Sequence, residues 1–68
     1  MNKTDKYRAE LAKLITDNMG KVAGKLFSDF YKDDEVESMT DGARALLDTM
    51  IGPTLTHKKI KEARKVLL

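Results

Sequence analysis

The residues of this chain whose types suit catalysis are few and scattered. His57 is the single histidine, and cysteine is absent. General acid–base catalysis needs a partner acid or nucleophile within hydrogen-bond reach of the histidine. Asp48, Thr54 and Thr56 lie nearby in the sequence but match no known catalytic arrangement, and no glycine-rich phosphate loop occurs. We interpret His57 as an exposed residue at a helix start and predict no enzyme activity, no cofactor and no small-molecule substrate.

Four carboxylates cluster at Asp33, Asp34, Glu35 and Glu37. A divalent cation prefers such oxygen ligands, but an EF-hand loop also needs a glycine at its sixth position and a glutamate at its twelfth. This segment has neither, and one histidine without cysteine does not make a zinc site. We interpret the cluster as a solvated connector and predict no bound metal.

The C-terminal region carries a run of cations at Lys58, Lys59, Lys61, Arg64 and Lys65. On a helix they would cover the exposed sides around an apolar stripe. Cations are disfavoured in the first turn of a helix, so we expect either acidic neighbours or an anionic partner there. The run is interpreted as a solvated face partly paired with the acidic segment, and contacts to nucleic-acid phosphates are the alternative.

The charges are segregated along the chain, although the net charge is only +2. Residues 1–28 hold six basic and three acidic side chains, residues 29–48 hold two and seven, and residues 49–68 hold five and one. This pattern is typical of an internally neutralised bundle or of a charge-matched dimer. A dedicated nucleic-acid binder would be basic more uniformly.

The elements that position these residues are predicted to be helices. Apolar residues recur at helical spacing, and almost no segment alternates as a strand does. We expect an all-α bundle of three or four helices arranged as αα-hairpins, with Thr4, Thr40 and Thr56 as N-caps. The expected helices cover roughly residues 4–18, 20–31, 40–51 and 54–67.

Gly20 leaves two interpretations of the first half open. The apolar pattern continues past it, so residues 4–31 form either one long bent helix or two helices that meet near Gly20. Two glycines, Gly20 and Gly24, lower helix stability, which favours a break. Their spacing of four also suits a close helix contact within or between subunits. Together with Phe27 and Tyr31 they form the predicted helix-packing or interface set.

A faint internal similarity appears at an offset of 32 residues. Leu14, Ile15, Met19 and Gly20 match Leu46, Leu47, Ile51 and Gly52. Both segments are an amphipathic helix that ends in an apolar residue and glycine, as two αα-hairpins would, although helix ends reuse glycine often enough for chance to produce the match.

Size and apolar content together predict self-association. A chain of 68 residues buries about 60% of the surface that its unfolded form exposes, so its stability alone is marginal. An apolar surplus at Met19, Phe27, Tyr31, Met39 and Leu68 suggests that a second subunit completes the core. The predicted core is Leu11, Leu14, Ile15, Val22, Leu26, Phe30, Leu46, Leu47, Met50, Ile51, Ile60, Ala63 and Leu67.

The segment from Leu14-Ile15 through Met19-Gly20-Lys21-Val22-Ala23 to Leu26 resembles small helical domains of unknown function at the ends of bacterial signalling proteins. The likeness extends over residues 11–67, with Lys21 standing where those domains often have proline. It implies a regulatory or interaction role with no catalytic residue.

We therefore expect a non-catalytic interaction, oligomerisation or regulatory module that forms a homodimer or binds another protein. The absence of cysteine, of a signal peptide and of a long apolar run suits a cytoplasmic protein without a membrane partner. The alternative is a small nucleic-acid-associated regulator that uses the basic C-terminal helix.

Overall fold

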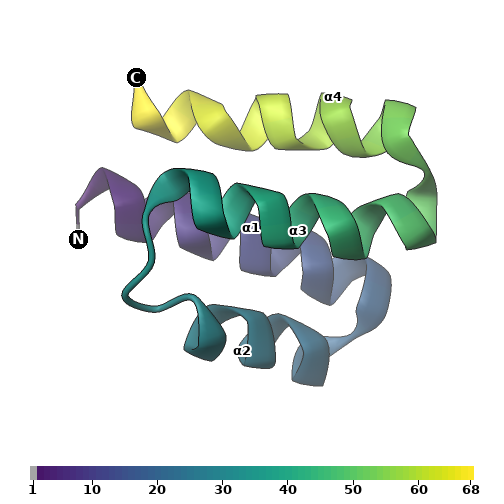
Figure 1. Cartoon of the computed structure of the whole chain (residues 1–68), viewed down its shortest axis with the longest axis horizontal. Coiled ribbons are helices and arrows are strands. Elements are labelled where there is room, and N and C mark those ends of the chain that lie inside the picture. The colour runs from purple at the N-terminus through teal and green to yellow at the C-terminus, as the bar shows by residue number, and fades with distance from the viewer. Residues whose placement is uncertain (1) are drawn as a thin grey trace.

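A computed structural model describes residues 2–68 and contains four α-helices and a closing 3-10 turn, with no strand among these residues. The all-α prediction is confirmed. Helices α1 and α3 pack side by side, while α2 and α4 lie on opposite sides of this pair (Figure 1). The elements are α1 (Lys3–Met19), α2 (Lys21–Phe30), α3 (Val36–Ile51), α4 (Pro53–Ala63) and η1 (Arg64–Leu67).

Helix starts differ from the predicted ones because other residues cap them. Asn2, not Thr4, caps α1, and its side chain accepts a hydrogen bond from the Asp5 amide at 2.8 Å. Helix α3 begins at Val36, four residues before the expected start, so Thr40 lies inside the helix. Its hydroxyl donates to the Val36 carbonyl at 2.7 Å instead of capping.

The last helix also starts early and ends differently. Gly52 is the N-cap of α4, and Pro53 takes the first helical position, where its missing N–H removes no hydrogen bond. Thr56, the expected cap, is therefore fully buried inside the helix. The chain after Ala63 tightens into the 3-10 turn η1 rather than continuing as α-helix to residue 67.

Gly20 breaks the first half into two helices, and Gly52 does the same in the second half. Their backbone angles are φ 97° and ψ 165° at Gly20, and φ 82° and ψ 159° at Gly52. Only glycine adopts this region without strain. Each glycine ends one helix and begins the next: the Gly20 amide donates to the Thr16 carbonyl, and the Gly20 carbonyl accepts from the Gly24 amide.

The 32-residue repeat is present in three dimensions. The buried positions of α1 are Tyr7, Arg8, Leu11 and Ile15. Those of α3 are Met39, Thr40, Ala43 and Leu47, each 32 residues further along. Thus α1, Gly20 and α2 form one αα-hairpin, and α3, Gly52 and α4 form a second with the same corner.

The core prediction is correct in the centre and wrong at one edge. Leu11, Ile15, Leu47, Ile60 and Ala63 are buried, while Leu14, Ile51 and Leu67 pack against them in part. The residues that sequence reasoning left out of the core are Tyr7, Phe27, Met39 and Ala43. Five predicted core residues are instead exposed to solvent: Val22, Leu26, Phe30, Leu46 and Met50.

The orientation of α2 explains this error. Its face toward α1 is built on Gly24 and Phe27, which are both buried. A Cβ atom at Gly24 would collide with the Thr16 hydroxyl and come within 2.9 Å of the Ala12 carbonyl oxygen, so the two helices touch closely there. The apolar arc of α2 is wider than this contact. Its other edge, at Val22, Leu26 and Phe30, is therefore left in solvent.

Candidate functional site

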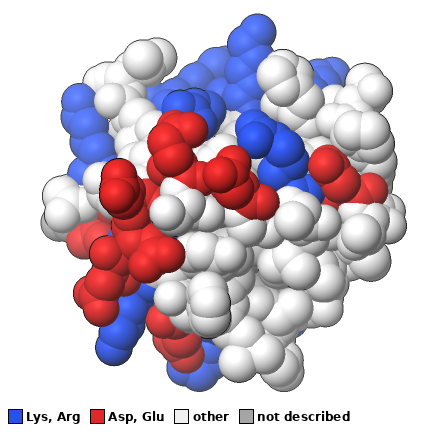
Figure 2. Space-filling view, viewed as in Figure 1, with Lys and Arg blue, Asp and Glu red and all other residues white. Residues whose placement is uncertain are grey.

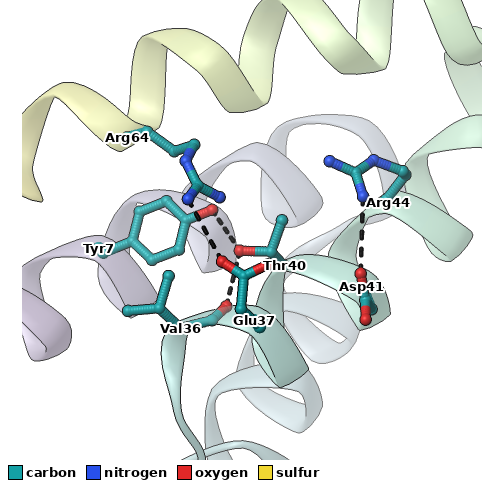
Figure 3. A network of polar contacts seen from close by, with 7 residues as sticks. All are labelled: Tyr7, Val36, Glu37, Thr40, Asp41, Arg44 and Arg64. Carbon is teal, nitrogen blue, oxygen red and sulfur yellow. Dashed lines mark hydrogen bonds and ion pairs between the residues drawn. The ribbon is translucent and has the colours of Figure 1, made fainter.

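A polar network, buried at its Tyr7–Thr40 hydrogen bond, joins the two hairpins on the α4 side of the molecule (Figure 3). The Tyr7 and Thr40 hydroxyls are 2.6 Å apart. Thr40 already donates its only proton to the Val36 carbonyl, so Tyr7 is the donor of this bond. The Arg64 guanidinium lies 6.0 Å from the centre of the Tyr7 ring and 3.3 Å from Glu37. This network fixes α1, α3 and η1 against one another.

A shallow hollow of about 340 Å³ lies beside this network, lined by Arg44, His57, Ile60, Lys61 and Arg64. Two of its cations already have carboxylate partners, because Arg44 lies 3.6 Å from Asp41 and Arg64 pairs with Glu37. The hydrogen bond that Arg64 donates to the Glu37 carboxylate raises the pKa of Arg64. His57 is exposed at this hollow, and the hollow lacks the acid or nucleophile that catalysis by His57 would need.

The predicted cationic residues all lie on α4 and η1. Lys58, Lys59 and Lys61 are exposed and form no ion pair within residues 2–68. Lys65 lies 3.0 Å from Glu62, and this hydrogen bond lowers the pKa of the Glu62 carboxyl. In Figure 2 many of the basic side chains gather at the top of the view, over α4, and most of the acidic ones lie at the left and centre.

The predicted interface residues make their contacts within the monomer. Gly20 joins α1 to α2, Gly24 lets α1 pack closely against α2, and Phe27 is buried. Tyr31 follows α2 and lies directly over Gly42 of α3, where a Cβ atom would collide with its ring. The Tyr31 carbonyl accepts a hydrogen bond from Arg8 Nε at 2.8 Å. These contacts hold the end of α2 against both α1 and α3.

Five of the seven exposed large apolar residues lie on α2 and α3, and the other two are Leu55 of α4 and Leu68. Val22, Leu26 and Phe30 are spaced by four and are 74%, 63% and 75% exposed. Leu46 and Met50 of α3, 37% and 51% exposed, continue the line from Gly42 at the same spacing. Because Gly42 faces Tyr31, this line lies on the α2 side of α3. We call these five residues the α2–α3 apolar face.

The surroundings of this face are free of charge along α3. Ser38, Ala45 and Thr49 are small and exposed, and with Gly42 they lie beside Leu46 and Met50 on the helix. In Figure 2 the lower right of the view, over the right-hand parts of α2 and α3, is correspondingly white. Small uncharged side chains permit another chain to approach the α3 backbone closely.

The repeat shows that the fold does not require these apolar residues. The positions in α4 that correspond to Val22, Leu26 and Phe30 are Thr54, Lys58 and Glu62, and all three are exposed. An outer helix of this hairpin therefore folds with polar residues at the same places. Aligning the two repeats would have revealed this difference from the sequence alone.

Other kinds of site are not found among residues 2–68. No three His, Asp or Glu side chains gather as metal ligands, and no helix has the length and apolar character to cross a bilayer. No protein-family model, curated protein or solved structure matches the chain. The α2–α3 apolar face is thus the feature that most calls for a functional explanation.

Proposed function

We propose that this protein is a non-catalytic interaction module that binds a protein partner through the α2–α3 apolar face. The observation that carries the proposal is the exposure of Val22, Leu26 and Phe30 at positions where the second hairpin has Thr54, Lys58 and Glu62. A contiguous apolar patch on a small protein is typical of an interaction surface.

Burial of this face supplies part of the driving force for association. Full burial of one large apolar side chain yields roughly 1.5–3 kcal/mol. The five side chains are exposed by between 37% and 75%, so covering them contributes several kcal/mol. Association also has an entropic cost, of about 4–15 kcal/mol. The small uncharged residues of α3 must therefore contribute contact area as well.

Photo-crosslinking in the native host tests the proposal. A photoreactive amino acid replaces Leu26, and the matched control carries it at Lys58, the corresponding exposed position of α4. We expect protein adducts from position 26 and none from position 58. Absence of any protein adduct at position 26 overturns the proposal.

Nucleic-acid binding through α4 is the second candidate function, favoured by the unpaired Lys58, Lys59 and Lys61. It predicts binding of duplex DNA or RNA that weakens steeply between about 50 and 200 mM salt. Replacing these lysines and Lys65 by glutamine abolishes such binding. No binding at 50 mM salt removes this candidate. A cytoplasmic location and a regulatory role belong to the proposal as well.

A further inference from the structure

We propose that the partner on the α2–α3 apolar face is a second copy of this chain, with the two α2 helices packed antiparallel across a two-fold axis near Leu26. This inference rests on the proposed function and names its partner. In such a dimer α2 and α3 of each subunit form a four-helix core, which covers the five exposed apolar residues of both chains.

The apolar stripe of α2 is self-complementary in this orientation. A two-fold axis at Leu26 sets Leu26 against Leu26 of the partner subunit, and Val22 against Phe30 of the partner subunit. The small valine thus meets the large phenylalanine at both ends. An isologous interface requires such matching, because each patch packs against its own copy.

The charges beside the stripe are complementary in the same way. Lys25 and Asp29 lie on one flank of the stripe, 3.5 Å apart and both well exposed. Antiparallel packing sets this flank against the same flank of the other subunit with its order reversed. Lys25 then lies two residues, about 3 Å along the helix axis, from the level of Asp29 of the partner subunit, and this offset is within the reach of a lysine side chain. The i,i+4 pair within one helix thereby becomes two pairs between helices.

The available area also suits a second copy. The chain has an accessible surface of 4547 Å². A standard interface covers about 800 Å² per partner, which is less than a fifth of this surface. The ten residues of α2 extend only about 15 Å and are too few for that area alone. Leu46, Met50 and their small neighbours on α3 supply the remainder.

Sedimentation equilibrium of the purified full chain over a wide concentration range tests the second copy. We expect twice the monomer mass at high concentration and its loss in Leu26→Lys, with the helical circular dichroism unchanged because Leu26 is exposed. Leu26→Gln is a milder second variant. The matched control is Leu55→Lys, which replaces an exposed leucine of α4 and keeps the dimer.

Charge exchange tests the antiparallel arrangement. Lys25→Glu or Asp29→Lys alone places like charges together twice in each dimer, and we expect about tenfold weaker association at low salt. An equimolar mixture of the two variants restores association as a heterodimer. The double variant K25E/D29K restores the homodimer, since both pairs become attractive again.

The outcomes separate this inference from the proposed function. A monomer at every concentration overturns the second copy, while crosslinking at position 26 to another protein would still uphold the interaction role. A dimer that survives Leu26→Lys overturns the placement of the interface. A dimer that Leu26→Lys disrupts but that does not respond to charge exchange overturns the antiparallel pairing of α2.

Discussion

The two αα-hairpins share one plan and differ in how their outer helices are used. In both, a long inner helix ends at a glycine with positive φ, and a shorter helix returns along it. In the second hairpin, α4 packs against both α3 and α1, and η1 packs against α1. In the first, α2 packs against α1 and makes few contacts with α3. Leu14 accordingly lies beside α4, while its counterpart Leu46 is exposed.

This difference separates residues that the fold needs from residues that a partner needs. The inner helices bury the same four positions in both repeats, so packing within the chain accounts for these positions. The outer helices carry polar residues where they face solvent in α4 and apolar residues at the same places in α2. Exposure of apolar side chains lowers solubility without stabilising the monomer, which is why we assign them to a partner.

The largest expected effect on stability is at Gly24 of α2, where the second hairpin has Thr56 at the corresponding position of α4. Gly24→Ala places a methyl group against Thr16 and the Ala12 carbonyl, and we expect a loss of about 2–3 kcal/mol in the free energy of unfolding. Urea denaturation measures it. Adding Thr16→Ala should recover part of the loss. If Gly24→Ala is neutral, α1 and α2 do not approach as closely as described.

The two glycine corners should respond alike. Gly20→Ala and Gly52→Ala meet no atom within 4 Å, so their cost comes only from the backbone conformation. We expect about 2 kcal/mol for each, measured by thermal or urea unfolding. A difference between the two that exceeds the error of measurement would contradict the equivalence of the corners.

A smaller difference distinguishes the two inner helices on their outer sides. Leu14→Ala removes a side chain packed beside α4, whereas Leu46→Ala removes a partly exposed one. At concentrations too low for association we expect Leu14→Ala to cost about 1 kcal/mol more in stability. At high concentration Leu46→Ala should weaken the dimer and Leu14→Ala should leave its affinity unchanged.

The smallest effect concerns Glu62, the polar counterpart of Phe30. Its hydrogen bond with Lys65 lowers the pKa of the carboxyl, so this pair contributes stability above the ordinary glutamate pKa and loses it as the pH falls through the lowered value. Lys65→Gln should return the pKa of Glu62 toward its ordinary range, as an NMR titration would show. An unchanged pKa would mean that Lys65 does not hold this carboxyl.

Much of the fold follows from local patterns. Helical spacing, the glycines at 20 and 52, and the proline at 53 predict three or four helices, with a break favoured at Gly20 and a stop at Gly52, because backbone preferences act within a few residues. Helix starts were less predictable, since Asn2 competes with Thr4 as a cap and Thr40 is drawn into the core by Tyr7. Which of several good capping residues acts depends on contacts far along the chain.

The candidate site was predictable only in composition. The sequence by itself determined that α2 is apolar around more than half its circumference and that its counterpart α4 is not. Only the tertiary structure decided which part of that arc is buried: Gly24 lets α2 approach α1 along one line, and the remaining edge faces solvent. Periodicity shows which side of a helix is apolar but not which other helix covers that side, because burial depends on where the other helices pack.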